Sequence, residues 1–308
     1  MLSLLISALL VATPAPTGPE GQCQAAPEGR IINGPGGPIF VRTIGEGRPI
    51  LMIPSLARGS HDFDILATAL AAKGYQSILP DPRATGASTS ASAKDLFDLA
   101  ADNIAVIQTL CTGPVVVLGH AFGNRVARSV ATAAPDRVTE VILLAGGGEA
   151  PPTPLVTAAL TGSLSEGMKP DAERLKDLRI AFFAKGNDAS VWLRGWYPKA
   201  ALLERKAGGA TVTERWWRAG SAPVLLVQAL EDPVAPPSNA AVLKRDLGDR
   251  LTLVALPHAS HAMLPEQPAA IAAVLIQYLN GERDERAFRA TIASTISPGP
   301  PSGARSAQ

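Results

Sequence analysis

The stretch VVVLGHAFGNRVA, residues 115–127, has the form of a turn that presents a catalytic nucleophile. An apolar run leads into a Gly-x-x-x-Gly pentapeptide, and a helical pattern follows. Gly119 and Gly123 supply the room that such a turn needs around its crowded, strained centre. The central position holds Ala121, whose side chain has no oxygen. No acyl-enzyme can form there, and losing the nucleophile of a catalytic triad costs about 10⁶ in turnover.

The elements that would position this turn can be predicted from the periodicity of apolar residues. Short apolar runs alternate with longer helical patterns, which is typical of an α/β fold with a mostly parallel, twisted sheet covered by helices on both faces. The predicted strands are residues 38–44, 49–54, 76–80, 114–119, 138–146, 223–230 and 251–256. Two helical patterns carry apolar stripes that we expect in the core, formed by Leu96, Ala100, Ile104, Ile107 and Cys111 and by Ile271, Val274, Leu275, Tyr278 and Leu279.

One segment, residues 149–221, interrupts the alternation and contains no convincing strand. All four tryptophans of the chain lie in it. We predict a helical insertion here, between the two parts of a sheet domain at 26–148 and 222–280, with a C-terminal tail at 281–308 whose Pro- and Gly-rich end is disordered. Trp192 and Trp196 are four residues apart and are predicted to point the same way from one helix. They either attach the insertion to the body or line a pocket.

Composition restricts the class of partner. The 308 residues carry a formal net charge of +1, with 46% hydrophobic and 18% charged residues, which suits a globular domain. No basic run is longer than two residues, so neither nucleic acid nor an anionic membrane surface is expected as a partner. A small molecule is the better expectation.

The N-terminus predicts export. Residues 2–12 form an apolar run too short to span a bilayer, followed at once by Pro and Gly residues. We predict a signal peptide at residues 1–25, cleaved after Ala25, and a periplasmic or secreted protein. Cys23, if it survives processing, could pair with Cys111; the alternative is that Cys111 is a buried apolar residue at the end of a helix. No Cys-x-x-Cys or His/Cys cluster is present, and we expect neither a metal nor another cofactor.

Taken together, residues 38–280 resemble an α/β-hydrolase. Besides the turn, LEDPVAPP after the strand at 223–230 resembles the acid loop of that family, and HASHAMLPEQP after the strand at 251–256 resembles its histidine loop. PDPRATGAS (80–88) resembles the family's D-x-R-G-x-G-x-S loop, with Ala84 where glycine is usual. The insertion at 149–221 falls where the family carries a helical cap.

The resemblance implies that Asp232 is the catalytic acid and His261 the base of the site, although Asp232 beside Pro233 could merely cap a turn. In the oxyanion loop, IPSLARGS, the backbone N–H groups of Leu56 and Phe122 would stabilise an oxyanion, since that role needs no side chain. Ser55 and Ser88 are the hydroxyls nearest these loops. Neither lies on a strained turn, so neither is expected to replace the missing nucleophile.

Other candidates for the substrate pocket are Ser55, His61, His120, Trp192 and Trp196. His120 lies beside the elbow and is expected to pack beneath the site, and His61 either reaches the pocket mouth or caps a helix. His258 is interpreted as a loop histidine. The scarcity of charge in the landmark loops favours a small, mostly apolar substrate, although arginines at 58, 83 and 194 could contact a carboxylate if they face inward.

Three functions fit this pattern. The first is a hydrolase-like enzyme in which His261 and Asp232 act as a general base with a backbone oxyanion hole and no serine nucleophile. The second is a catalytically silent relative that binds a small ligand or a partner protein. The third is a cofactor-free lyase or oxygenase. Retention of a titrating pair in an apolar cleft favours an enzyme.

Overall fold

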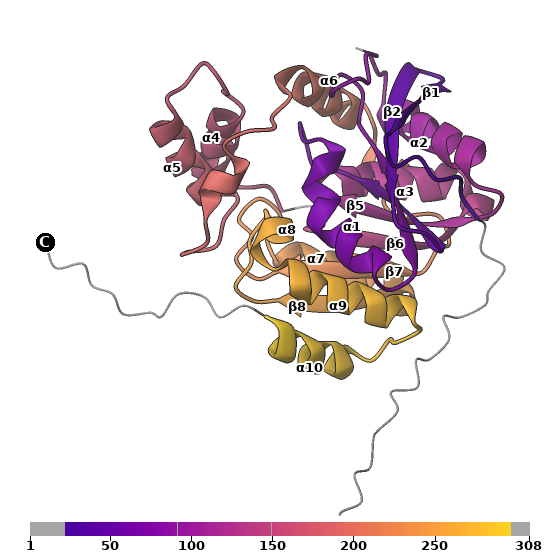
Figure 1. Ribbon diagram of the computed structural model, residues 1–308. Coiled ribbons are helices and arrows are strands. Elements are labelled where there is room, and N and C mark those ends of the chain that lie inside the picture. The colour runs from indigo at the N-terminus through magenta and orange to yellow at the C-terminus, as the bar shows by residue number, and fades with distance from the viewer. Residues whose placement is uncertain (1–21, 91, 149, 297–308) are drawn as a thin grey trace, which may run out of the picture.

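The computed structural model describes residues 22–90, 92–148 and 150–296, and in these ranges the chain forms one eight-stranded sheet (Figure 1). The strand order is β1-β2-β4-β3-β5-β6-β7-β8; β2 is antiparallel to both β1 and β4, and all other neighbours are parallel. The strands are β1 Arg30–Gly34, β2 Gly37–Ile44, β3 Arg48–Ile53, β4 Tyr75–Pro80, β5 Val115–His120, β6 Val138–Leu144, β7 Val224–Ala229 and β8 Leu251–Leu256. The α/β class predicted from the sequence is confirmed.

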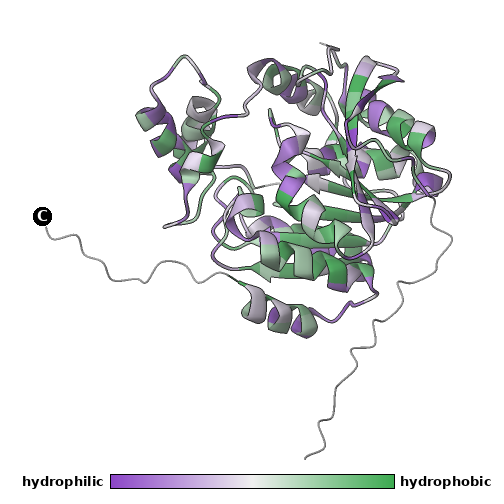
Figure 2. Ribbon diagram, viewed as in Figure 1, coloured by the Kyte–Doolittle hydropathy of each residue, from purple (hydrophilic) through white to green (hydrophobic). Residues whose placement is uncertain are grey.

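Helices cover both faces of this sheet, as the nearly continuous apolar strands require (Figure 2). One face is covered by α2, α3 and α7, and the other by α1, α9 and α10. The helices are α1 Asp64–Ala71, α2 Leu96–Leu110, α3 Phe122–Ala133, α4 Pro154–Ser163, α5 Asp171–Ala181, α6 Pro198–Gly209, α7 Ser238–Leu247, α8 Met263–Glu266, α9 Pro268–Leu279 and α10 Glu285–Thr295. Within the described chain, no helix is long and apolar enough to cross a membrane.

The insertion between β6 and β7 is helical in its described part. Helices α4 and α5 stand apart from the body of the sheet, and α6 returns toward it (Figure 1). A separate apolar cluster joins the insertion to the body; it includes Phe182, Trp192 and Trp196 from the insertion and Ala57 and Ala262 from loops after β3 and β8. The insertion therefore lies over the ends of the parallel strands, where open α/β sheets bind ligands. We refer to it as the cap.

Both ends of the described chain belong to the folded body more fully than the sequence indicated. Cys23 forms a disulfide with Cys111, and the Ala26 N–H donates to Thr43 Oγ1 over 2.7 Å. Cleavage after Ala25 stays a prediction, but it would remove this disulfide. Residues 1–21 and the predicted disordered end at 297–308 lie outside the described residues.

The beginning of the C-terminal tail is a packed helix. In α10, Phe288 is fully buried and Ile292 nearly so, both in the core cluster formed with α1 and α9. The sequence did not predict this helix, because the start of the tail is rich in charged residues and only a few apolar residues mark the buried face. The strand β1, which pairs antiparallel with β2, also escaped prediction, since RIING is short and half exposed.

Candidate active site

Ala121 occupies a strained turn between β5 and α3. Its φ is 50° and its ψ is −112°. Residues other than glycine rarely adopt this backbone conformation, and such strained residues cluster at functional sites. The two glycines are required by close backbone approach. A Cβ on Gly119 would lie 2.3 Å from the Gly123 carbonyl oxygen, and one on Gly123 would lie 2.2 Å from that of Ile53. The turn thus has the tight backbone expected of a nucleophile elbow, and its central side chain is a methyl group.

Asp232 and His261 form a buried hydrogen-bonded pair. His261 Nδ1 lies 2.9 Å from Asp232 Oδ2. The other oxygen, Oδ1, accepts hydrogen bonds from the backbone N–H groups of Val234 and Ala235, both at 2.8 Å. These bonds fix the carboxylate and orient the imidazole, so that Nε2 is the ring nitrogen left for chemistry. The pairing inferred from the family resemblance is present in the structure.

The loop after β3 contains Leu56, a candidate oxyanion donor, and a hydrogen bond to a cap residue fixes this loop. The Ala57 N–H donates to the Glu204 carboxylate over 2.7 Å, and Ala57 has a positive φ of 59°. Glu204, on α6, is fully buried, and this burial raises the pKa of its carboxyl to about 8. No partner of the Leu56 or Phe122 N–H is found among the described residues, and both residues face the same cavity. These two N–H groups remain available to a ligand.

A cavity of about 380 Å³ lies between the elbow, the histidine loop and the cap, within the size range of small-molecule sites. Its wall is mostly apolar, with two arginines at one part of it. The lining residues include Ser55, Leu56, Ala121, Phe122, Arg125, Leu160, Leu164, Phe182, Trp196, Arg205, Val234 and His261. The candidate base, the elbow position and both candidate oxyanion residues therefore share one cavity.

Three of the predicted pocket residues, His61, His120 and Trp192, do not line this cavity, whereas His120 packs beneath the site as its place beside the elbow indicated. His61 is exposed and pairs through Nδ1 with Asp64 Oδ2 at 3.0 Å. His120 is fully buried beneath the site, where its Nε2 lies 2.8 Å from the His261 carbonyl oxygen. Burial, reinforced by His261, lowers the pKa of His120 to about 3, so its ring is neutral and serves as a support for the histidine loop.

The two cap tryptophans have different roles. Trp196 lines the cavity, whereas Trp192 packs edge-on against Phe182 and Phe183. They do not share one helix, because the short 3-10 turn Ala189–Trp192 ends before Trp196. The Arg58 guanidinium lies 4.7 Å and 4.8 Å from the centres of the two indole rings. Trp192 therefore contacts the body through Arg58 and, edge-on, through His120, with 6.2 Å between the two ring centres.

The arginines that the sequence offered as possible carboxylate contacts all have internal partners. Arg58 makes a two-point ion pair with Asp62 at 2.8 Å and 2.6 Å. Arg83 pairs with Asp102, and Arg194 with Asp171 at 2.6 Å. None of the three lines the cavity of about 380 Å³.

Ser88 is likewise outside the site, because its Oγ donates to the Asp81 carbonyl oxygen and accepts from the Phe40 N–H, both at 2.9 Å.

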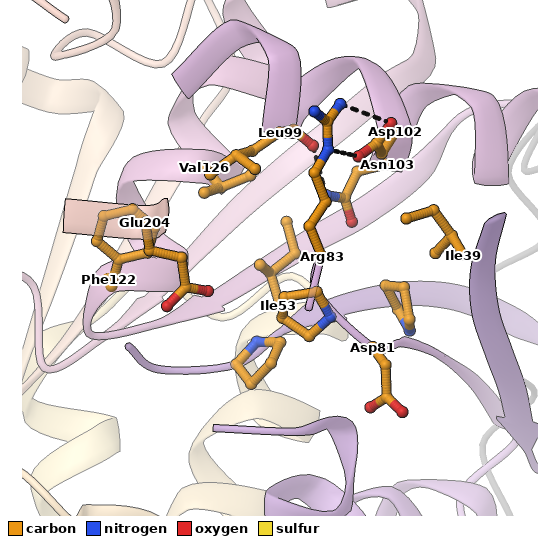
Figure 3. Close-up of a pocket in the computed structure, with 13 residues that line it drawn as sticks. Ile39, Ile53, Asp81, Arg83, Leu99, Asp102, Asn103, Phe122, Val126 and Glu204 are labelled. Atoms are coloured by element: carbon orange, nitrogen blue, oxygen red, sulfur yellow. Dashed lines mark hydrogen bonds and ion pairs between the residues drawn. The ribbon is translucent and has the colours of Figure 1, made fainter. Parts of the chain in front are cut away.

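Arg83 instead borders a second, much smaller cavity of about 30 Å³ beside the oxyanion loop (Figure 3). In that view, Glu204 and Phe122 face the cavity from one side, and the paired Arg83 and Asp102 close another. The volume is close to that of one water molecule, which is too small for a substrate. Glu204 was missed by sequence analysis, because nothing in its local pattern distinguishes a buried glutamate of an amphipathic helix from an exposed one.

An eight-stranded sheet with this strand order, an elbow after β5, an acid after β7 and a histidine after β8 together define an α/β-hydrolase. The chain matches the model of the alpha/beta hydrolase family over residues 50–274, and it belongs to that family. It is 26% identical over 274 residues to a non-heme haloperoxidase of Rhodococcus erythropolis, covering 78% of this chain and 95% of that protein.

Further similarity is found to a non-heme chloroperoxidase of Streptomyces lividans, 25% identical over 289 residues, covering 82% of this chain and 99% of that one. Among solved structures, an esterase from Exiguobacterium antarcticum superposes with a TM-score of 0.69 at 20% identity, over 82% of this chain and 100% of the esterase. This likeness concerns the fold.

Proposed function

We propose that the protein is a hydrolase-like enzyme that acts on a small, mostly apolar substrate without a covalent intermediate. The observation that carries the proposal is the buried His261–Asp232 pair facing a ligand-sized cavity in which the elbow presents a methyl group. Burying a carboxylate is costly unless it is fully hydrogen-bonded, and here three bonds satisfy Asp232. Such an arrangement suits a general base.

In the proposed reaction, His261 Nε2 removes a proton from a water molecule that occupies the space above Ala121. The resulting hydroxide attacks an ester carbonyl carbon, and the Leu56 and Phe122 N–H groups stabilise the tetrahedral oxyanion. When the intermediate collapses, the C–O bond to the leaving alcohol breaks and the proton on His261 passes to the departing oxygen. Asp232 keeps the imidazole in the required orientation and stabilises its protonated form.

Two alternatives have specific support. A catalytically silent ligand-binding protein is favoured by the absence of any nucleophilic atom at position 121. A cofactor-free lyase or oxygenase, in which His261 removes a proton from a substrate C–H or O–H group, fits the same geometry, because that step needs a base and no nucleophile at position 121. Some similar chains are named for chemistry other than hydrolysis, as non-heme haloperoxidases.

The first test is the turnover of 4-nitrophenyl acetate by the parent, by His261→Ala and by His258→Ala, against a buffer blank. His258 lies in the same loop with its side chain exposed, so its replacement controls for disturbance of the loop. General-base hydrolysis predicts steady turnover without a burst by the parent and the His258 variant, and none by the His261 variant. Equal rates for all three proteins and the blank would refute ester hydrolysis by this pair for that substrate.

We also propose that the protein works in an oxidising compartment outside the cytoplasm. The pairing of Cys23 with Cys111 supports this, because disulfides persist mainly in exported proteins. The check is the intact mass of protein recovered from the native host, with and without reduction and alkylation. Full-length protein with two free thiols would count against the proposal, whereas a mass that shows loss of residues 1–25, and with them Cys23, would support export by cleavage instead of by the bridge.

A further inference from the structure

Two arginines line the active-site cavity without an anionic partner. Arg125 lies on α3 and Arg205 on α6, and both border the cavity that contains His261. Among the described residues, neither guanidinium has a carboxylate within ion-pair distance, and the described lining contains no Asp or Glu. Two guanidinium groups without a carboxylate partner among the described residues therefore border a mostly apolar cavity.

Of the two, Arg125 is half-buried and Arg205 is exposed. Arg58 and Arg83 each pair with an aspartate and lie outside the cavity. Desolvation lowers the pKa of Arg125, and its neighbour Arg128, fully buried between Trp216 and Trp217 with ring centres at 4.6 Å and 4.7 Å, gives it no compensation. An unpaired, partly desolvated guanidinium such as that of Arg125 is costly, and an anionic ligand would remove that cost. The exposed Arg205 adds a second positive charge to the same lining.

The placement of Arg125 relates it to the reacting centre. It follows the elbow residue Ala121 by four positions, which corresponds to roughly 6 Å along the axis of α3. Its guanidinium packs against α6, since a Cβ added at Gly208 would lie 3.5 Å from Arg125 Nη1. Arg125 borders this cavity and also a neighbouring one that contains Trp216. Arg205 precedes Gly208 by three residues on the same helix, and so extends the positive region along the cap side.

We propose that Arg125 and Arg205 form a subsite for the carboxylate of a substrate or ligand whose remaining part is apolar. The carboxylate binds the two guanidinium groups through charge-assisted hydrogen bonds. The apolar chain lies against Leu160, Leu164 and Phe182, and the reacting group lies near Ala121 and His261. The inference rests on the function proposed above only in taking this cavity as the ligand site, and it names the substrate class.

The test is direct binding by calorimetry of hexanoate and of hexanamide, which has the same chain and no charge. In the parent, hexanoate is expected to bind about 10- to 100-fold more tightly than hexanamide. The double variant Arg125→Gln/Arg205→Gln should lose this preference while keeping its affinity for hexanamide. Arg194→Gln, which removes an exposed cap arginine paired with Asp171, is the matched control and should keep the preference.

A carboxylate could instead bind the histidine and the oxyanion donors, so His261→Ala is included. Loss of the preference in His261→Ala, with no change in the arginine variant, would overturn the proposal, as would equal binding of the two probes by the parent. Each arginine is also replaced singly, so that one misfolded variant does not decide the result. Because no turnover is measured, a carboxylate preference without ester hydrolysis would contradict only the proposed reaction, and hydrolysis without a preference would contradict only this subsite.

Discussion

Replacing Ala121 with serine should create a working nucleophile. The backbone at this position already has the conformation of the elbow, with φ of 50° and ψ of −112°, so the change adds one oxygen to a Cβ that is in place. The residue lines the cavity that also contains His261, which leaves space for a hydroxyl. His261 is oriented by Asp232 over 2.9 Å, as a triad requires.

The size of the gain follows from the parts that are present. A complete triad exceeds the same site without its nucleophile by about 10⁶ in turnover. Each oxyanion donor contributes a factor of about 10² to 10³, and the Leu56 N–H lies in the loop after β3, next to Ala57 with its positive φ of 59°. If that donor is poorly aligned, the gain falls to about 10³ to 10⁴. We therefore expect Ala121→Ser to hydrolyse 4-nitrophenyl acetate about 10³- to 10⁶-fold faster than the parent.

The assay combines steady-state turnover with labelling by a fluorophosphonate, which is read as an increase in intact mass. Ala121→Ser should show a burst and take up one label, and the double variant Ala121→Ser/His261→Ala should lose both properties. Ala145→Ser, which adds a hydroxyl to another buried alanine lining the same cavity, is the control and should take up none. A folded Ala121→Ser protein with neither label nor added turnover would refute the reasoning that the dyad, elbow and cavity form a competent site.

Three further predictions concern stability. The folded-state pKa of Glu204, about 8, lies above its ordinary value of 4.5, so its neutral form stabilises the fold and that contribution is lost as pH rises from about 4.5 to about 8. Each pKa unit is worth about 1.4 kcal/mol. Glu204→Gln, whose amide oxygen can still accept from the Ala57 N–H, should therefore flatten the fall in Tm between pH 6 and pH 9. An unchanged dependence of Tm on pH would contradict the raised pKa of Glu204. Cys23→Ser should lower the free energy of unfolding by about 2–4 kcal/mol, because the bridge to Cys111 closes a loop of 88 residues; denaturant unfolding with and without reductant checks this, and equal midpoints would exclude the bridge. Phe288→Ala should cost about 3–5 kcal/mol in the same assay, since the side chain is fully buried, whereas a cost near zero would place α10 outside the core.

The sequence predicted the fold in most respects, because parallel strands buried on both faces must be nearly continuous apolar runs. The strand predicted at 251–256 coincides with β8, and that predicted at 114–119 lies within one residue of β5. Strand β1 and helix α10 were not predicted, because each depends on tertiary packing of a few apolar residues in a polar segment.

The site was predicted in part for a similar reason. The elbow and the two loops after β7 and β8 have local signatures, and the structure brings Ala121 and His261 to one cavity. Which polar side chain faces inward depends on partners distant in sequence. Arg58, Arg83 and Arg194 are each neutralised by an aspartate that local sequence does not single out, and Arg125 and Arg205 are left in the cavity wall.

This cavity has two unusual features, a missing hydroxyl at position 121 and two unpaired guanidinium groups. Both bear on which ligand the cavity binds. A site that only excluded water would gain stability by losing the buried Asp232 and the strained backbone of Ala121, since each costs free energy. In this protein, Asp232 is instead fully hydrogen-bonded and a neutral His120 supports the histidine loop. The N–H groups of Leu56 in the loop after β3 and of Phe122 at the elbow have no partner among the described residues. A ligand that brings its own carboxylate to Arg125 and its own reacting oxygen to the space above Ala121 would satisfy these groups together, which is why charge, and not size, is the first property to vary in a substrate search.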